Sequence, residues 1–400
     1  MKVLHSCGHV VGGSVLIAST MIGVGMLALP VATAQGGFLP ATSLYLLCWI
    51  FMLCTGLLML EVCIWMPKDA NMITMVTKLL GTPGKIFCWF IYLFLFVTVM
   101  IAHVAGGGDI LNAIFGNTLP HWLSKIIYVL VFIPIVYLGT RSVDRTNLLL
   151  MAGLIISYIL FIYFIKDHVR LEPLKRAEWS KAWFALPVIF TAFTFQLIIP
   201  TIMNYMERNV KKVRLSIFIG TALPLVIYLL WEFVILGTIP FEGENSLTEA
   251  STYGQTAVIP LKAITNNPYL FSVGKAFAFF TLTASYLALS LAYLDFLADG
   301  LKVKKSAANK IWLCLLVFIP PTLIALLYPY IFLTALSYAG GYSCAILFGL
   351  FPPLMVWAGR HYKHYHDETK QLFGGRYFLT VLILFVVVEV VLETMNTIIH

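Results

Sequence analysis

The chain has 400 residues, of which 60% are hydrophobic and only 11% are charged, and its formal net charge is +8. A water-soluble domain carries about 25% charged residues, so this composition excludes a soluble protein and indicates that lipid is the solvent. The basic residues stand in short runs between apolar segments, as they do beside membranes, and no nucleic-acid partner is expected.

Eleven apolar segments are long enough to cross a bilayer, because a spanning helix needs roughly 20 apolar residues. They are continuously apolar rather than alternating, which predicts helices and not a β-barrel. A tight turn is expected at Tyr328-Pro329-Tyr330, between two spans. The sequence predicts an all-α integral membrane protein, a single polytopic membrane domain (1–400) with spans near 10–34, 38–64, 85–113, 124–140, 146–165, 183–206, 214–238, 269–298, 310–328, 330–358 and 376–396.

Charge in the loops predicts the orientation. With the N-terminus inside, 18 of the 26 Lys and Arg residues lie in inner loops, which satisfies the positive-inside rule. The predicted topology therefore has a cytoplasmic N-terminus and an outer C-terminus. Loop 166–181 is basic although it is expected outside, and its Leu171, Trp179 and Trp183 indicate a segment lying on the membrane surface.

Two spans contain signals for an interrupted helix. The first has Gly23 and Gly25 one residue apart, followed by Pro30, and glycine and proline both weaken a helix. The sixth has polar residues at mid-depth, Thr194 and Gln196, before a proline. Interruptions five spans apart predict an inverted repeat of five plus five helices, with repeat one at about 10–165, repeat two at about 183–358 and an extra helix at 376–396.

An interrupted helix in lipid leaves N–H and C=O groups unpaired, at several kcal/mol each. Such a break persists where it lines a cavity and meets a ligand. The free N–H groups suit a carboxylate and the free carbonyls suit an ammonium group or a cation, so a zwitterionic amino acid fits both. Close packing of small residues between helices is the alternative interpretation of the glycines, and the second interruption favours a site.

At these residues the chain resembles the bacterial aromatic amino acid permeases, the tyrosine- and tryptophan-specific group of the amino acid-polyamine-organocation superfamily. The resemblance implies a leucine-transporter (LeuT) type fold with discontinuous helices 1 and 6, and substrate held by spans one, three, six and eight. It also implies uptake coupled to protons. The matching stretches run in order along nearly the whole chain: Ile22 to Pro30, Leu60-Glu61-Val62, Ala105 to Gly108, Ile199-Pro200-Thr201, Tyr205-Met206, Asp295 to Gly300 and Tyr338-Ala339-Gly340.

Carried over onto this sequence, the resemblance implies a substrate site in three spans. His103 stands where the family more often has tyrosine, and the sixth span lacks the family's usual glycines and histidine. These departures bear on the choice of substrate more than on the fold. The expected substrate-binding residues are Ser19, Thr20, Ile22, Gly23, Val24 and Gly25, then His103, and then Phe193, Thr194, Phe195 and Gln196.

Ionisable groups within spans are costly and need a partner or a role. Glu61, Ser285 and Asp295 are expected to act in coupling or gating. The alternative is that Glu61 reaches the headgroups or pairs with Lys68, and that Asp295 pairs with a Lys or Arg of an inner loop. His103 is expected either to carry a proton, because an unperturbed histidine titrates near neutral pH, or to be a buried, hydrogen-bonded residue. Glu232 and Glu389 are expected near the outer ends of their spans, reaching the surface or pairing locally.

The sequence thus predicts a secondary active symporter of a bacterial inner membrane, which imports an aromatic amino acid, tyrosine before tryptophan, with protons. A sodium-coupled symporter, with Ser285 and carbonyls of the first span holding Na⁺, and a permease for another neutral amino acid are the alternatives. The expected partners are the amino acid, the coupling ion and membrane lipids, with no cofactor and no resident metal. An enzyme is disfavoured because metal-ligand spacing, a Gly-x-Ser-x-Gly elbow and a phosphate loop are all missing from the sequence.

Overall fold

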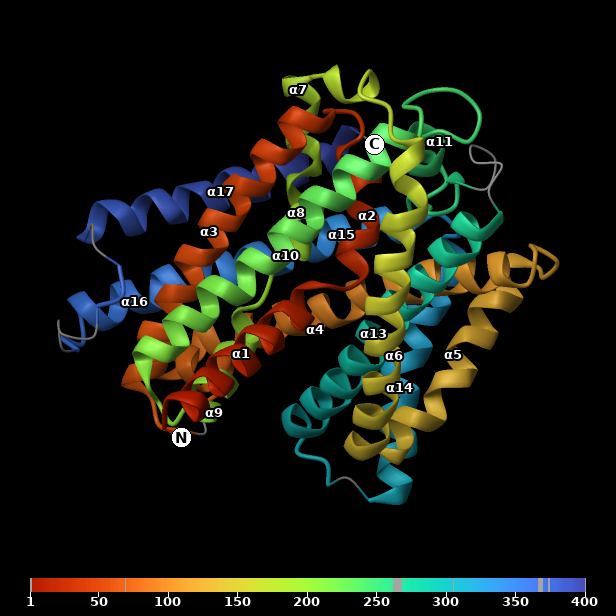
Figure 1. The fold of residues 1–400 in the computed structure, drawn as a ribbon. Coiled ribbons are helices and arrows are strands. Elements are labelled where there is room, and N and C mark those ends of the chain that lie inside the picture. Colours follow the sequence, from red (N-terminus) through yellow and green to blue (C-terminus); the bar gives the residue numbers. More distant parts are fainter. Residues whose placement is uncertain are drawn as a thin grey trace.

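The computed structural model of the chain describes residues 2–68, 70–261, 268–304, 306–365, 370–372 and 375–399. Within these ranges every regular element is a helix (Figure 1). Among the described residues, ten helices are long and apolar enough to cross a membrane, and the bent pair α1 and α2 makes an eleventh span when it is taken as one. The prediction of an all-helical membrane protein with about eleven spans is therefore confirmed.

Most spans agree with the predicted segments to within a few residues, but the first begins at Lys2 instead of residue 10 and the fifth at Thr140 instead of residue 146. The third span is described below. The connecting helices are η1 (Lys166–His168), η2 (Pro173–Lys175), α7 (Trp179–Ala182), η3 (Trp183–Ala185), η4 (Gln196–Ile198) and α11 (Leu247–Thr252). The spanning helices are α1 (Lys2–Met21) with α2 (Val24–Thr33), α3 (Phe38–Trp65), α4 (Met72–Ile114), α5 (His121–Leu138), α6 (Thr140–Ile165), α8 (Leu186–Ala192) with α9 (Ile199–Tyr205), α10 (Val210–Thr238), α13 (Pro268–Gly300), α14 (Ala307–Leu327), α15 (Phe332–Tyr338) continued by η5 (Ala339–Leu350) and α16 (Phe351–His361), and α17 (Gly375–Ile399).

Burial separates central from peripheral helices. In the apolar stretches of α6 and α17 only 28% of the residues are buried, against 78% in the span Phe332–His361. Leu148 and Leu149 of α6 are 75% and 73% exposed, so large apolar side chains point outward. Exposure of this kind suits a lipid surface, and it places α6 and α17 at the periphery and the tenth span at the centre.

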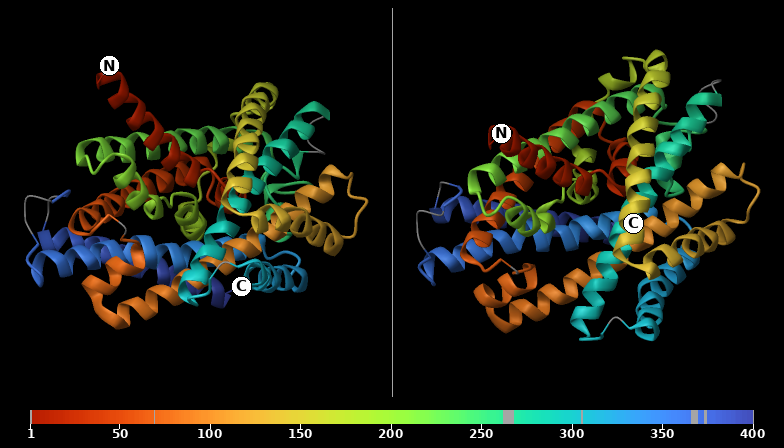
Figure 2. Two further views of the ribbon diagram at one scale, coloured as in Figure 1. Left: turned by 90° about the horizontal axis from the view of Figure 1, so that it is seen from below. Right: turned by 60° about the horizontal axis from the view of Figure 1, so that its bottom comes forward.

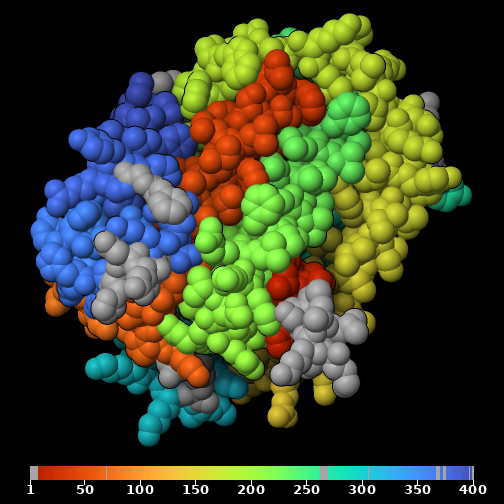
Figure 3. All heavy atoms as spheres, turned by 60° about the vertical axis from the view of Figure 1, so that its left-hand side comes forward, coloured from red at the N-terminus to blue at the C-terminus, as the bar shows by residue number. Residues whose placement is uncertain are grey.

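Two helix pairs give the bundle its arrangement. α1 lies along α10, and α6 lies along α13 (Figure 1). α3 packs beside α10 on the face shown in Figure 3, where the orange and green helices run together. Figure 2 shows α1 and α10 on one side of the molecule and the blue helices of the tenth span on the opposite side. α2, the second half of the first interrupted span, packs on α8 of the other interrupted span.

The third span begins earlier than predicted. α4 starts at Met72 instead of residue 85, and it bends at Gly81, whose φ of 78° lies in the left-handed region. Asn71 caps the helix, because its side chain accepts a hydrogen bond from the Thr74 N–H at 2.9 Å. The added segment is less continuously apolar than the span itself, which is why apolar length alone missed it.

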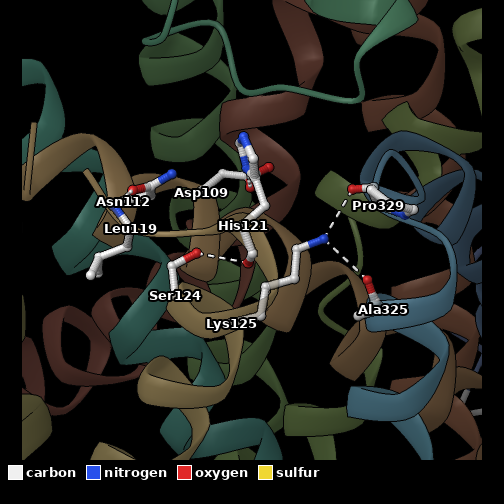
Figure 4. A network of polar contacts seen from close by, with 8 residues as sticks. All are labelled: Asp109, Asn112, Leu119, His121, Ser124, Lys125, Ala325 and Pro329. Carbon is white, nitrogen blue, oxygen red and sulfur yellow. Dashed lines mark hydrogen bonds and ion pairs between the residues drawn. The ribbon is translucent and has the colours of Figure 1, made fainter. Parts of the chain in front are cut away.

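A tight turn separates α14 from α15 at Tyr328-Pro329-Tyr330, as predicted. A buried lysine stabilises it. Lys125 of α5 is 2% exposed, and its Nζ donates to the carbonyl oxygens of Ala325 and Pro329, each at 3.1 Å (Figure 4). Gly108 of α4 leaves room for this side chain, since a Cβ there would lie 2.4 Å from Lys125 Cγ. The glycine stretch that marks the family resemblance therefore has a packing role.

The tenth span changes its winding where it meets the sixth. Its middle part, η5, is a π-helix that begins at Ala339. A Cβ at Gly340 would overlap the carbonyl oxygen of Pro187 in α8, so only glycine permits this approach. Thr191 of α8 donates to the Leu336 carbonyl at 2.9 Å. These contacts hold α8 against the central span.

Candidate functional site

The first interruption falls between α1 and α2. α1 ends at Met21, α2 begins at Val24, and their axes differ by 54°. Gly23 has extended backbone angles (φ −159°, ψ −151°), and its carbonyl accepts the Met26 N–H at 3.1 Å. The first N–H groups of a helix have no partner within the helix, so the start of α2 presents donors in the middle of the bundle.

The second interruption falls between α8 and η4. α8 ends at Ala192, and residues 193–195 are not helical. Gln196 holds this stretch with its side-chain amide: Oε1 accepts the Phe195 N–H at 3.0 Å, and Nε2 donates to Thr55 Oγ1 of α3 at 2.9 Å. The amide thereby replaces hydrogen bonds that a continuous helix would have made.

The two interruptions touch each other. A Cβ at Gly25 would lie 3.0 Å from the Cα of Ala192, so the start of α2 packs on the end of α8. The Tyr228 hydroxyl of α10 lies 2.6 Å from the Met21 carbonyl oxygen and 3.1 Å from the Ala192 carbonyl oxygen. One hydroxyl proton therefore serves the last carbonyls of both α1 and α8.

Sequence reasoning missed Tyr228. A phenol in the seventh span gave a signal, since a buried Tyr O–H needs a partner. Its partners could not be read from the sequence, because they depend on which spans pack together.

His103 of α4 and Ser285 of α13 lie beside the first interruption. His103 Nδ1 is 2.7 Å from the Val99 carbonyl and therefore carries a proton, while Nε2 is 2.8 Å from Ser285 Oγ. A Cβ at Gly23 would lie 3.2 Å from Ser285 Cβ. The structure thus brings together three of the predicted residues, from spans one, three and eight.

The remaining polar residues of the predicted site bond to backbone carbonyls of their own spans. Ser19 and Thr20 donate to the carbonyls of Leu16 and Ile17, at 2.9 and 2.7 Å. Thr194 donates to the Phe190 carbonyl at 2.8 Å. Thr20 is exposed, Ser19, Ile22 and Thr194 are half-buried, and Val24 is buried.

The two predicted aromatic partners are covered by protein. Phe193 is fully buried, with ring centroids 6.0 Å from Tyr45 and 5.2 Å from Tyr228. Phe195 lies against Gly56 of α3, where a Cβ would be 2.4 Å from its ring. Both rings pack on neighbouring helices in this conformation.

The predicted coupling carboxylates lie apart from the interruptions. Glu61 forms a buried ion pair with Arg360 of α16, with two N–H···O contacts of 2.7 Å. The Gln371 N–H also donates to it, at 2.9 Å. The expectation that Lys68 pairs with Glu61 is therefore wrong, because α16 brings a guanidinium closer. Asp295 is half-buried and stands ten residues beyond Ser285 on α13, about 15 Å along a helix.

A cavity of about 240 Å³ opens beside the second interruption. The polar residues of its lining include Gln196, Lys68, Asn71 and Asn204. Tyr92 and Phe348 contribute aromatic surface. The cavity therefore connects the edge of the second interruption with the end of the bundle that carries Lys68.

These features define a class of protein. A bundle of membrane spans in which two interrupted helices meet is the architecture of membrane transporters. Among solved structures, a manganese transporter from Eremococcus coleocola has the same fold, with a TM-score of 0.61, 13% sequence identity, and 96% of this chain and 85% of that chain covered.

The chain belongs to the tryptophan/tyrosine permease family, whose model matches residues 7–393. It is 30% identical to a tryptophan-specific transport protein of Pseudomonas aeruginosa, over 95% of this chain and 93% of that protein. It is also 30% identical to tyrosine-specific transport system 1 of Haemophilus influenzae, over 93% of each chain. The family resemblance expected from the sequence is confirmed, and the relatives are transport proteins rather than enzymes.

Proposed function

We propose that this protein imports an aromatic amino acid, tyrosine before tryptophan, across a bacterial inner membrane together with protons. The observation that carries the proposal is the meeting of the two interrupted helices at Gly25 and Ala192. There the Tyr228 hydroxyl bonds the last carbonyls of α1 and α8. Relatives named for tyrosine and for tryptophan are equally similar to the chain, which supports an aromatic substrate.

The substrate carboxylate binds at the start of α2, where the N–H groups of Gly23, Val24 and Gly25 lie at the positive end of a helix dipole. The substrate ammonium group takes one of the two carbonyls that share Tyr228, at Met21 or Ala192. One hydroxyl proton cannot fully satisfy two carbonyl oxygens, so the substrate ammonium group supplies the second donor. The binding energy of the substrate then favours the conformation in which the transporter is closed around it.

The side chain of the substrate lies near His103 and Ser285, which offer a polar partner for a phenol hydroxyl. This is the reason for placing tyrosine before tryptophan. Phe193, Thr194, Phe195 and Gln196 form the other wall of the site, and their contacts with α3 and α10 change as the transporter cycles. Glu61 with Arg360, and Asp295, act as gates away from the substrate.

Transport follows an alternating-access cycle built on a five-plus-five inverted repeat, 10–165 and 183–358, with 376–396 as an extra helix. Interruptions in spans one and six support the repeat. The cavity beside Gln196 opens at the Lys68 end, which the positive-inside rule places in the cytoplasm, with the N-terminus inside and the C-terminus outside. The structure then corresponds to a state with inward access.

Uptake of labelled tyrosine into vesicles containing the purified protein tests the proposal. A pH gradient, acid outside, should drive accumulation above equilibrium, and an uncoupler should abolish it. Unlabelled tyrosine should compete better than tryptophan. Accumulation driven by a sodium gradient alone would replace protons with Na⁺ as the coupling ion, and equilibration without accumulation would contradict symport.

A further inference from the structure

A buried carboxyl group in the seventh span has two hydroxyl partners and, among the residues that the structure describes, no cation beside it. Glu232 of α10 is 0% exposed. Its Oε1 lies 2.5 Å from Thr33 Oγ1 at the end of α2, and its Oε2 accepts the Tyr45 hydroxyl of α3 at 2.7 Å. The expectation that Glu232 reaches the surface is wrong, because α2 and α3 cover this part of α10.

The hydrogen bonds around Thr33 are complete when Glu232 carries a proton. Thr33 has one hydroxyl proton, and its Oγ1 also lies 2.8 Å from the Leu29 carbonyl oxygen. A protonated carboxyl donates to Thr33, Thr33 donates to Leu29, and Tyr45 donates to the second carboxyl oxygen, so every group is satisfied. With a carboxylate, the single Thr33 hydroxyl proton bonds either Glu232 or the Leu29 carbonyl, and one of these two side-chain hydrogen bonds is lost.

The charges around Glu232 do not neutralise it. Among the described residues none forms an ion pair with Glu232. The titratable groups facing it are phenols, Tyr45 on α3 and Tyr228 one turn earlier on α10, while Tyr158 of α6 bonds the Ile227 carbonyl. Arg176 lies just beyond the end of α2 and is engaged by the carbonyls of Ala34 and Gln35, at 2.7 and 2.9 Å.

The other buried carboxyl groups are less suited to take up and release a proton. Glu61 is held by Arg360, and protonating it would leave a buried guanidinium unpaired. Glu389 and Glu393 are buried on α17, the helix outside the proposed repeats. Glu232, in contrast, contacts α2 directly and lies one turn from the hydroxyl that joins both interruptions.

We propose that Glu232 binds and releases the transported proton, and that Thr33 and Tyr45 transmit its charge state to the two interrupted helices. The inference rests on the proposed proton-coupled uptake and assigns the residue responsible. An O–H bond forms at the carboxylate with a proton from the side of entry, and it breaks when the proton leaves to the other side. Thr33 carries the change to α2, and the Tyr45 ring carries it to Phe193 of the second interruption.

The test compares the wild type with Glu232→Gln, which mimics the protonated form permanently, and with Glu389→Gln as a matched buried carboxyl group. Vesicles containing each protein are assayed for tyrosine accumulation under a pH gradient and for tyrosine–tyrosine exchange without one. We expect Glu232→Gln to lose at least about tenfold of the gradient-driven accumulation while exchange continues, and Glu389→Gln to keep both.

The assignment would be overturned if Glu232→Gln accumulated tyrosine as well as the wild type does. It would also be overturned if Glu389→Gln alone lost gradient-driven accumulation. If the wild type itself ignores the pH gradient, the proposed proton coupling has failed, which is a different result from failure of the variant. If Glu232→Gln lacks exchange as well, Tyr45→Phe decides. Removing a donor to the carboxylate should move the pH of half-maximal uptake upward by about 0.5–1 unit, and an unmoved profile would refute the role of Glu232.

Discussion

Replacing Tyr228 by phenylalanine removes a single hydroxyl group from the point where the two interrupted helices meet. The ring stays, so its packing on Phe193 at 5.2 Å is preserved. The carbonyls of Met21 and Ala192, at 2.6 and 3.1 Å, both lose their donor. A buried polar group without a partner costs about 1–3 kcal/mol, and the ends of α1 and α8 are no longer held together.

Loss of the hydroxyl lowers the affinity for the substrate, because the substrate binds to the arrangement that Tyr228 maintains. A loss of about 1–3 kcal/mol corresponds to a dissociation constant for tyrosine that is roughly 5- to 150-fold higher. Calorimetric titration of the purified protein measures it. Tyr158→Phe is the matched control, since it removes a partly buried hydroxyl that bonds a carbonyl of α10, Ile227 at 3.2 Å, and no carbonyl of α1 or α8. Unchanged affinity in Tyr228→Phe, or an equal loss in both variants, would refute the reasoning.

Three further substitutions test other parts of the structure. Gly25→Val should abolish tyrosine binding, because its Cβ would already lie 3.0 Å from the Ala192 Cα; binding at wild-type affinity would disprove this contact. Glu61→Gln should lower the free energy of unfolding by about 3–5 kcal/mol, because Arg360, 5% exposed at its side chain, loses its partner. Thermal unfolding in detergent measures it, and adding Arg360→Met should restore part of the loss. Lys125→Met should also lower the unfolding temperature, since the α14–α15 turn loses two hydrogen bonds. The affinity for tyrosine should stay within about twofold. A larger change in affinity than in stability would show a functional role for this lysine.

Apolar length was sufficient to predict the spans, because each must cover the same thickness of lipid. The exception was the start of α4 at Met72, where a bent segment around Gly81 extends the helix beyond its apolar part. The tight turn at Pro329 was predicted from its proline and flanking tyrosines. The lysine that stabilises the turn comes from α5, and no local signal connects the two.

The candidate site was predictable only in part. Gly23 and Gly25 mark the first interruption by composition, and the structure ends α1 and begins α2 between Met21 and Val24. Tyr228 was missed, and Glu232 was expected to reach the surface or pair locally. The surroundings of both residues depend on the packing of α10 against α1, α2 and α3. Glu61 was recognised as important, yet its partner lies 299 positions along the chain, beyond any sequence spacing rule.

A cryo-electron microscopy map of the protein with bound tyrosine tests the central claim most directly. The account predicts ligand density between the start of α2 and the end of α8, with the carboxylate within hydrogen-bonding distance of the N–H groups at Gly23–Gly25 and the ammonium near the Met21 or Ala192 carbonyl. Tyrosine bound elsewhere, with these backbone groups satisfied by an unbroken helix, would contradict it.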